Sequence, residues 1–226
     1  MAVYNGEKYI QEQILSILKQ LSCSDEIVIS YDKSTDNTYR IISDLAVRDC
    51  RIKLFRGPSK GAIKNFENAL QHCKNDYIFL SDQDDIWLEN KVSRVLSAFK
   101  HKRADVVLHD CCVIDDNEAT IHPSFFKFRH CTRGFLFNLL HNSYIGCCMA
   151  LRREFLPQVL PFPEKIPMHD QWIGLMGEKN GTVTFVHSPL IKYRRHSSNA
   201  SSLRHSKLSD MIKLRLNLIS AIIKRK

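Results

Sequence analysis

The sequence predicts an α/β fold with a mostly parallel sheet flanked by helices. Its 226 residues fit a single domain, and its first half alternates short apolar runs with stretches of helical spacing. Strands that alternate with helices of about 10–15 residues form βαβ units and therefore a parallel sheet. Hydrophobic residues at 44% and charged residues at 25% are the proportions of a globular protein, which excludes a disordered tail.

The first half supplies these elements in order. Apolar, β-branched runs predict strands at Met1–Tyr4, Glu26–Ser30, Ile52–Phe55 and Tyr77–Leu80. Apolar residues at helical spacing predict helices over Tyr9–Leu21, Thr38–Val47 and Ala62–Cys73. Because an inner strand usually has about 5–6 residues, we expect the first strand to begin upstream of Met1.

The second half is less regular. Strand-like runs occur at Ala104–Leu108, Cys111–Ile114, Val183–Val186 and Leu190–Tyr193, and a basic, phenylalanine-rich stretch spans Phe125–Phe137. The end of the chain predicts a basic amphipathic helix whose apolar face holds Leu208, Met211, Ile212, Arg215, Ile219, Ile222 and Ile223. Such a helix either lies on an anionic membrane surface or packs on the domain with its charges in water.

Cysteine spacing and hydropathy indicate the cellular compartment in which the protein is expected. The eight cysteines include no C-x-x-C pair, which predicts reduced thiols in a cytosolic protein rather than a zinc site or a disulfide framework. No apolar run approaches the roughly 18 residues of a membrane span, and no leader precedes the first motif, so we expect no secretion. A net charge of +9 keeps a nucleic-acid-binding protein among the alternatives.

Two acidic loops each follow a predicted strand. Asp32 follows the second strand, and Asp82, Asp84 and Asp85 follow the fourth. Parallel strands present ligands at their carboxyl ends, so both loops are expected at the same edge of the sheet. Three carboxylates within four residues repel one another, and Mg²⁺ or Mn²⁺ would relieve that repulsion. The alternative is a solvated acidic turn.

Five motifs in order extend this pattern: Met1–Gly6, Tyr31–Thr38, Asp82–Trp87, His169–Trp172 and Tyr193–Asn199. Together they resemble the signatures of family 2 glycosyltransferases, and most closely the bacterial rhamnosyltransferase-like branch. The resemblance covers roughly residues 1–200. It implies a GT-A fold with a nucleotide-sugar-binding half at 1–100, an acceptor-binding half at 101–200 and the basic helix at 201–226.

The resemblance also implies roles for residues on the donor side. Tyr4 would stack on the base, Asp32 would hydrogen-bond the base, and Asp82 would approach the ribose. Asp84 would bind the Mg²⁺ or Mn²⁺ that bridges the diphosphate. The remaining donor-side candidates are His196 for the metal or diphosphate, Arg194 and Arg195 for phosphate oxygens, and Lys64 and Asn65 for the nucleotide. Lys64 and Asn65 could equally form only the polar face of a helix, and His196 could be an ordinary loop residue.

On the acceptor side, the resemblance points to Asp170 as the catalytic base. An acceptor hydroxyl loses its proton as it attacks the anomeric carbon, and a carboxylate can take that proton. One base without an enzyme nucleophile implies a single displacement with inversion; the alternative for Asp170 is a helix N-cap. Further residues expected near the acceptor or sugar are Trp87, Gly146, His169 and Trp172, of which the tryptophans could instead be packing groups and Gly146 a strand glycine.

These observations predict an inverting, metal-dependent glycosyltransferase for cell-surface polysaccharide synthesis. It would move a sugar, with rhamnose as a candidate, from a dTDP- or UDP-sugar to a saccharide or lipid-linked saccharide. We expect it in the cytoplasm, with peripheral contact to the inner face of the membrane through the terminal helix and no nucleic acid partner. The alternatives are a sugar nucleotidyltransferase, which typically has a glycine-rich phosphate loop that is missing here, and a basic nucleic-acid-binding protein, in which the clustered acids would repel phosphate.

Overall fold

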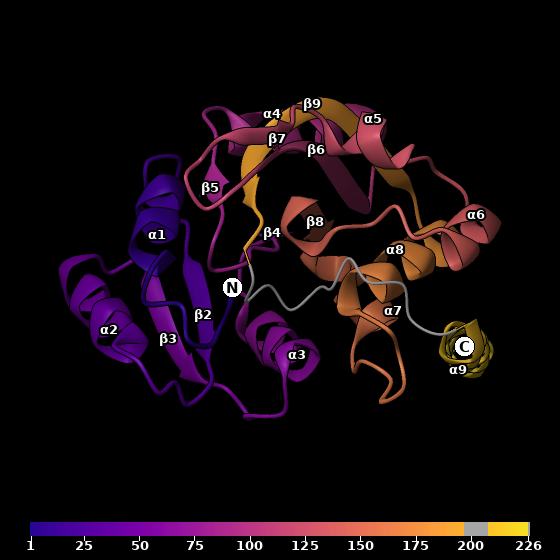
Figure 1. Ribbon diagram of the computed structural model, residues 1–226, viewed down its shortest axis with the longest axis horizontal. Helices are drawn as coiled ribbons and strands as arrows, with labels where there is room; N and C mark the ends of the chain where they lie inside the picture. The colour runs from indigo at the N-terminus through magenta and orange to yellow at the C-terminus, as the bar shows by residue number, and fades with distance from the viewer. Residues whose placement is uncertain (197–207, 226) are drawn as a thin grey trace.

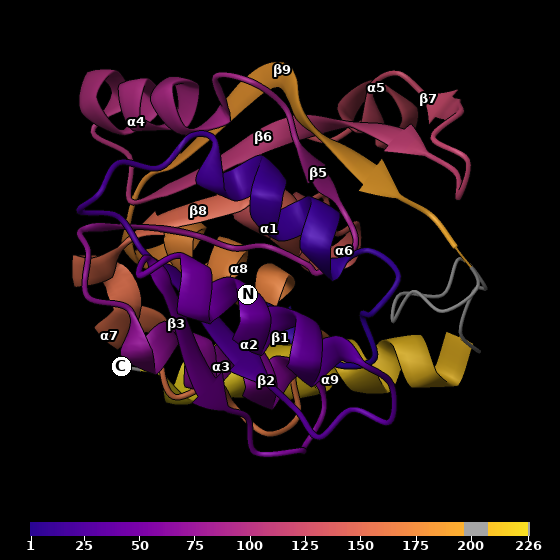
Figure 2. The same cartoon turned by 90° about the vertical axis from the view of Figure 1, so that its left-hand side faces the viewer.

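The computed structural model of the chain describes residues 1–196 and 208–225. It contains two sheets that lie side by side, each covered by helices (Figures 1 and 2). The first sheet is built from the first 56 residues, and the second takes strands from the remainder of the described chain. These findings confirm the predicted α/β class.

The first sheet has the strand order β1 (Ala2–Val3), β2 (Ile27–Tyr31) and β3 (Ile52–Arg56), and all its strands are parallel. The crossovers are α1 (Ile10–Leu18) and α2 (Thr38–Arg48), while α3 (Ala62–His72) follows β3. Figure 1 shows α1 and α2 on one side of this sheet and α3 on the other. Each element lies where the spacing of apolar residues predicts it, because buried positions such as Ile10, Ile29 and Ile42 face one core.

The second sheet has the order β4–β8–β6–β9–β5, with β7 paired to β6. Its strands are β4 (Tyr77–Phe79), β5 (Ile86–Trp87), β6 (Val106–Ile114), β7 (Thr120–His122), β8 (Met149–Arg152) and β9 (Val183–Arg194). Only β6 and β9 are parallel, so the parallel arrangement is confined to the first sheet and this one pair. Antiparallel strands need no crossover helix, which is why helix–strand alternation stops after β4.

Two strands are longer than the sequence predicts. The end of the run Ala104–Leu108, from Val106, and the run Cys111–Ile114 belong to the single strand β6, and the two later runs belong to β9. Within β6, His109 and Asp110 are buried, and the Asp110 carboxylate accepts the N–H groups of Cys111 and Phe126. The pairing of β6 with β9 shifts register at this point, so a bulge accommodates the polar residues without ending the strand.

Helices cover the second sheet and connect its strands. Their bounds are α4 (Lys91–Lys102), α5 (Phe125–Arg129), α6 (Phe135–Leu140), α7 (Leu156–Val159), α8 (His169–Asn180) and α9 (Leu208–Lys224), with 3₁₀ turns η1 (Gly146–Cys148) and η2 (Arg153–Phe155). The largest core contribution comes from α8, in which Trp172, Leu175 and Met176 are fully buried. This helix thereby fixes the position of its own first turn, which carries His169 and Asp170.

The terminal helix α9 packs on the domain, but only part of its predicted apolar face is buried. Leu218 and Ile222 are buried, whereas Ile212, Ile219 and Ile223 are exposed. The side chain of Leu208 and the expected boundary at residues 200 and 201 lie outside the described residues. None of the helices described, α9 included, has the length and hydropathy needed to cross a bilayer.

Candidate functional site

The loop between β4 and β5 carries Asp82, Asp84 and Asp85, and hydrogen bonds from neighbouring elements hold it in place. The side chain of Gln83 makes two bonds to the backbone of Tyr4: its Oε1 accepts from the N–H at 2.9 Å, and its Nε2 donates to the carbonyl at 2.8 Å. From α1, Gln13 Nε2 donates to the Asp82 carbonyl at 3.0 Å. The acidic loop is therefore tied to the end of β1 and to α1, as expected for strand ends that meet at one edge of the fold.

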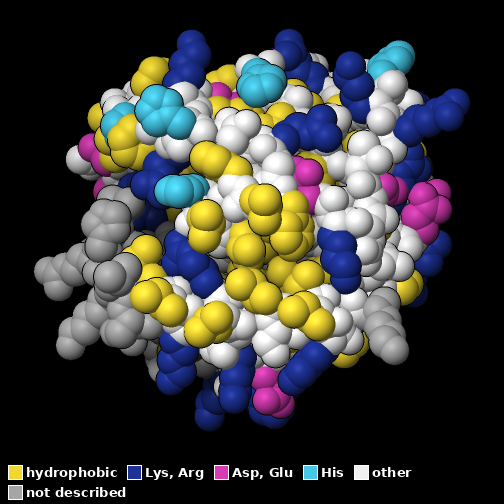
Figure 3. Space-filling view, turned by 90° about the vertical axis from the view of Figure 1, so that its right-hand side faces the viewer, with side chains coloured by type: hydrophobic (Ala, Val, Ile, Leu, Met, Phe, Trp, Pro, Cys, Tyr) yellow, Lys and Arg dark blue, Asp and Glu magenta, His cyan; other side chains and the backbone are white. Residues whose placement is uncertain are grey.

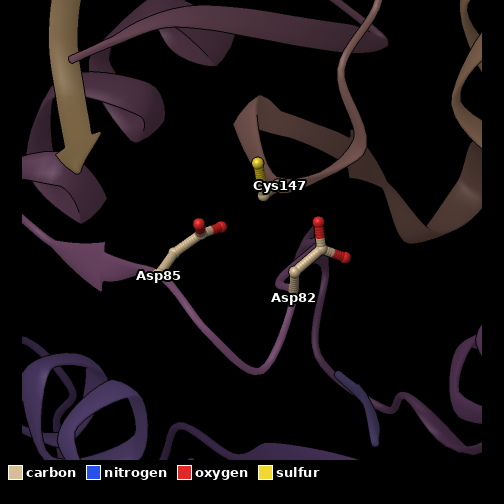
Figure 4. Close-up of side chains that lie close together, drawn as sticks. All are labelled: Asp82, Asp85 and Cys147. Atoms are coloured by element: carbon tan, nitrogen blue, oxygen red, sulfur yellow. The ribbon is translucent and has the colours of Figure 1, made fainter. Parts of the chain in front are cut away.

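Two carboxylates of this loop face a buried thiol. One ligand atom each from Asp82, Asp85 and Cys147 lies within 4.8 Å of the others, and Figure 4 shows the Cys147 side chain above the two carboxyl groups. Burial, followed by the charges of Asp84 and Asp170, raises the pKa of Asp82 to about 7. Burial and the charges of Asp84 and Asp82 raise the pKa of Asp85 well above its ordinary value. The carboxylates of this cluster therefore lack enough nearby positive charge to balance them when they are ionised.

Lys91 lies next to this cluster on its buried side. Lys91 is fully buried, its Nζ donates to the Cys147 carbonyl at 3.1 Å, and it sits 4.0 Å from the ring centroid of Trp87. Burial lowers the pKa of Lys91 to about 8, although the neighbouring thiols and Asp85 act to raise it. Lys91 thus offsets part of the negative charge from the interior side of the cluster.

Asp84 points to a different partner. His196, 112 residues away along the chain, places its Nε2 2.8 Å from Asp84 Oδ2, and its ring stacks on Tyr9 with centroids 5.0 Å apart. The structure therefore brings together the two residues predicted to bind the metal. It does not include either of them in the group of Asp82, Asp85 and Cys147.

Asp170 lies in the first turn of α8, next to the turn η1. Its Oδ2 accepts the N–H of Gly146 at 3.1 Å, and its Oδ1 accepts the N–H of Gln171 at 2.6 Å. Part of Asp170 remains open to solvent, yet the surrounding protein raises the pKa of its carboxyl to about 6, against the opposing effect of the two N–H groups. A carboxylate with this pKa is ionised at neutral pH and can still accept a proton.

Gly146 allows η1 to approach the start of α8 closely. A Cβ at this position would lie 2.8 Å from His169 Nε2, which is shorter than a van der Waals contact. His169 is buried, its ring stacks on Phe66 with centroids 4.0 Å apart, and neither ring nitrogen has a hydrogen-bond partner among the described residues. Burial lowers the pKa of His169 to about 3, so the imidazole beside Asp170 is neutral.

The loop after β2 forms a second polar region. Asp32 is buried, and its Oδ1 accepts the N–H of Ser59 at 2.7 Å, which leaves Oδ2 as the oxygen that can face a ligand. Tyr4, at the end of the neighbouring strand β1, is 55% exposed. These two residues are the predicted base-binding pair, and the structure places them on adjacent strand ends.

The other predicted residues have partners within the protein. Lys64 pairs with Glu67, Asn65 donates to the Val3 carbonyl, and Arg195 donates to the Tyr193 hydroxyl. The guanidinium of the buried Arg194 pairs with Glu12 at 2.9 Å and donates to the Asp84 carbonyl at 3.1 Å. Both tryptophans are in the core, and the Trp172 indole N–H donates to the Val159 carbonyl. Residues Ser197–Asn199 of the fifth motif lie outside the described residues.

The donor set fits a divalent cation. Asp85 Oδ2 is buried without a hydrogen-bond partner among the described residues, and burial and the charges of Asp84 and Asp82 raise the pKa of Asp85. Carboxylate oxygens suit Mg²⁺ and Mn²⁺, whereas the Cys147 thiol adds a softer donor. Sequence reasoning missed Cys147 and Lys91; only the vicinal pair Cys147–Cys148 beside the glycine motif could have drawn attention to that turn.

Comparisons with known proteins agree with this geometry. The family model for glycosyl transferase family 2 matches residues 1–160. The chain is 30% identical over 213 residues to UDP-Glc:alpha-D-GlcNAc-diphosphoundecaprenol beta-1,3-glucosyltransferase WfgD of Escherichia coli, covering 92% of this chain and 80% of the relative. It is 28% identical over 226 residues to the dTDP-rhamnosyl transferase RfbG of Shigella flexneri, covering 88% of this chain and 72% of the relative.

A solved structure shows the same fold. The crystal structure of S. aureus TarS 1–349 in complex with UDP-GlcNAc superposes with a TM-score of 0.76 at 18% identity, over 100% of this chain and 66% of that chain. Together with the family match, this confirms the expected fold. The chain belongs to glycosyl transferase family 2 and is a glycosyltransferase.

Proposed function

We propose that the protein is a metal-dependent, inverting glycosyltransferase that moves a hexosyl or 6-deoxyhexosyl group from a UDP- or dTDP-sugar to a lipid-linked saccharide. The observation that carries the proposal is the convergence of the acidic loop after β4 with Asp170 of α8. The turn η1 connects them: the Gly146 N–H donates to Asp170 Oδ2 at 3.1 Å, and the Sγ of the next residue, Cys147, lies within 4.8 Å of carboxylate oxygens of Asp82 and Asp85. The donor half and the acceptor half of the chain thus meet at these carboxylates.

The donor nucleotide would bind at the ends of β1 and β2. The exposed ring of Tyr4 offers a stacking surface, and Asp32 Oδ2 offers an acceptor for the N–H that uracil and thymine share. The diphosphate would then lie toward Asp82, Asp84 and His196. We assign the cation to this acidic loop, where Asp84, His196, Asp82, Asp85 and Cys147 are the candidate ligands.

The chain's own residues supply the chemistry at the acceptor. Asp170 takes the proton of the attacking hydroxyl on a carboxylate oxygen as the bond to the anomeric carbon forms and the bond to the diphosphate breaks. The N–H groups of Gly146 and Gln171 orient the carboxylate. A bound cation would supply Lewis-acid stabilisation of the negative charge on the leaving diphosphate. A single attack from the face opposite the diphosphate inverts the anomeric centre.

The relatives support the class of donor and acceptor. One is named for transfer from UDP-Glc to a diphosphoundecaprenol-linked sugar, and the other is named as a dTDP-rhamnosyl transferase. Both relatives are named for donors that combine a pyrimidine-dione nucleotide with an uncharged sugar. We therefore infer a role in cell-surface polysaccharide synthesis, and a cytoplasmic location that agrees with eight cysteines free of disulfides.

A donor panel tests this proposal. Release of nucleoside diphosphate from UDP-Glc, UDP-GlcNAc and dTDP-rhamnose is measured with Mn²⁺, with Mg²⁺ and with chelator. We expect turnover of one donor that chelator abolishes, that added metal restores and that Asp84→Ala lowers by about 100-fold or more. The exposed Asp44 on α2 provides the control variant Asp44→Ala, which should keep full activity. Metal-independent turnover, or full activity of Asp84→Ala, would contradict the proposal.

A further inference from the structure

The terminal helix α9 carries a stripe of apolar residues that faces solvent. Ile212, Leu216, Ile219 and Ile223 follow one another at intervals of four, three and four residues and are 51%, 61%, 36% and 72% exposed. This spacing places all four side chains along one side of the helix. On a surface helix of a soluble protein, the side that faces solvent normally carries polar residues. We therefore expect this apolar stripe to contact a partner.

The stripe is not the side on which the helix packs. The neighbouring side, about 100° around the helix, buries Leu218 and Ile222. Polar contacts fasten the same side: Lys179 Nζ donates to the carbonyls of Ile222 at 3.1 Å and Arg225 at 2.9 Å, and Arg225 Nη2 donates to the Pro157 carbonyl at 2.8 Å. The helix is therefore held in place, with its second apolar side turned outward.

The helix α6 enlarges this surface. Leu136, Phe137 and Leu140 are 74%, 38% and 53% exposed, and Arg215 of α9 donates to the Leu140 carbonyl, which links the two helices. Figure 3 shows apolar side chains gathered on the face of the molecule to which α6 and α9 belong. We call these seven residues the α6–α9 patch: Leu136, Phe137, Leu140, Ile212, Leu216, Ile219 and Ile223. Contiguous exposed apolar surfaces of this kind mark interaction sites.

Most charges near the patch are positive; the exception at α6 is Glu178, which accepts the N–H of Gly134 at the start of that helix. The sequence contains no Asp or Glu between Glu118 and Glu154, a segment that includes α6 and the basic residues Lys127, Arg129 and Arg133. On α9, Lys213 and Lys224 are exposed beside the stripe. Figure 3 shows Lys and Arg side chains around the apolar area and few acidic ones. An apolar surface bordered by cations matches the interface of an anionic bilayer.

We propose that the α6–α9 patch docks the protein onto an anionic lipid surface. A second copy of the chain is a poorer occupant, because a two-fold contact would bring the same positive borders against each other. Lipid acyl chains accept Ile, Leu and Phe without requiring matched polar groups, and anionic headgroups pair with the lysines. The docking itself does not depend on the chemistry of transfer.

The location of the patch suits a lipid-linked acceptor. Helix α6 packs on α8, and Gln171 Nε2 donates to the Asn138 carbonyl at 2.9 Å. Gln171 follows Asp170 directly, so one hydrogen bond links α6 to the residue next to the proposed base. An acceptor whose lipid is in the bilayer would present its saccharide on this half of the molecule.

Vesicle sedimentation tests the docking surface in the absence of donor, so its outcome is separate from that of the transfer assay. The full chain should bind vesicles of phosphatidylcholine mixed with phosphatidylglycerol and should bind less at high salt or without phosphatidylglycerol. The double variant Leu216→Asp/Ile223→Asp should lower the partition coefficient by about tenfold or more. Val47→Asp, at an 89% exposed apolar position on α2 at the opposite end of the molecule, should bind like the wild type (Figure 1).

A second double variant, which changes only charged residues, tests the proposal even if the aspartate variant misfolds. Lys213→Glu/Lys224→Glu leaves the apolar stripe intact and should weaken binding to anionic vesicles only. Vesicle binding that is unchanged in both double variants would overturn the proposal. The proposal would also be overturned if the wild-type chain does not bind vesicles but forms a dimer that Leu216→Asp/Ile223→Asp abolishes. The patch would then bind a second copy of the chain.

Discussion

The acidic loops after β2 and β4 differ in what surrounds their carboxylates, and the pKa values shift in opposite directions. In the loop after β2, Asp36 accepts N–H groups from Thr38 at 3.0 Å and Glu7 at 3.2 Å. Burial acts to raise the pKa of Asp36, but hydrogen bonds from Thr38 and Glu7 outweigh it and the pKa is lowered. In the loop after β4, burial and neighbouring carboxylates raise the pKa of Asp82 and Asp85.

This contrast separates carboxylates that stabilise a loop from those that we propose bind a cation or substrate. A carboxylate that accepts backbone N–H groups is most stable when ionised, so it strengthens the loop that contains it. Carboxylates that face one another destabilise the fold in their ionised form, and a site of this kind is expected where a cation or substrate will later balance the charge. The sequence pattern of the two loops is similar, but their environments are not.

The largest effect is expected from removing the proposed base. Asp170→Asn should keep UDP binding within about twofold of wild type and lower the rate of transfer by about 10²–10⁴, because the amide cannot take a proton. Isothermal titration with UDP and Mn²⁺, together with a transfer assay, measures both quantities. Asp36→Asn, in the contrasting loop, serves as the control with near-normal transfer. Rapid transfer by Asp170→Asn would remove Asp170 from the base role.

The pH dependence of the transfer rate tests the assignment of Asp170 as the base. The base acts only when ionised, and the pKa of Asp170 is about 6, so the rate at saturating Mn²⁺, where a bound cation would keep Asp82 ionised, should be flat above that pH. Below it, the rate should fall about tenfold for each pH unit. The residual rate of Asp170→Asn should lack this limb. The measurement is kcat at saturating donor and acceptor from pH 4.5 to pH 8; a flat wild-type profile would break the link between the raised pKa and catalysis.

A smaller effect is expected at Gly146, where η1 meets α8. In Gly146→Ala the new Cβ would lie 2.8 Å from His169 Nε2, so either η1 or the stacked imidazole must move. We expect a loss of about 1–3 kcal/mol in the free energy of unfolding and a lower kcat, since the Gly146 N–H also orients Asp170. Urea denaturation provides the measurement. The double variant Gly146→Ala/His169→Ala should recover stability relative to Gly146→Ala; no recovery would show that the clash lies elsewhere.

The smallest effects should have opposite signs in the two loops. The pKa of Asp36 is lowered, so its stabilisation is present above the ordinary pKa near 3.8 and is lost in acid; Asp36→Asn should slightly lower the melting temperature at neutral pH, because Asp36 is exposed to solvent. The pKa of Asp85 is raised, so its ionisation costs stability as pH rises, and Asp85→Asn should raise the melting temperature more at pH 8 than at pH 5. Equal shifts in both variants would contradict the comparison.

Much of the donor half could be predicted without a structure. The helix predicted over Thr38–Val47 is α2 at Thr38–Arg48, and the one over Ala62–Cys73 is α3 at Ala62–His72. These elements follow the spacing of their own buried residues, which is a local property. The pairing of β4 with β8 could not be predicted in the same way, because strands in an antiparallel sheet choose partners far along the chain.

The site shows the same division. Asp84 and Asp170 were recognisable because each belongs to a short motif, whereas Lys91 and Cys147 belong to none and enter the site only through packing. Arg194 was predicted to face the diphosphate because of its type and position. The structure shows its guanidinium on Glu12, a contact between residues near opposite ends of the described chain.

By itself, the sequence determined the alternation of strands and helices in the first half, the placement of acidic loops at strand ends and the family signature. Each of these depends on residues close together in the chain, whose periodicity and turn chemistry act locally. Only the tertiary structure decided which carboxylates crowd together, which accept N–H groups and which side of α9 faces solvent. Those outcomes depend on burial and on charges brought together from distant segments, and they decide the pKa values and exposed surfaces through which the protein would act.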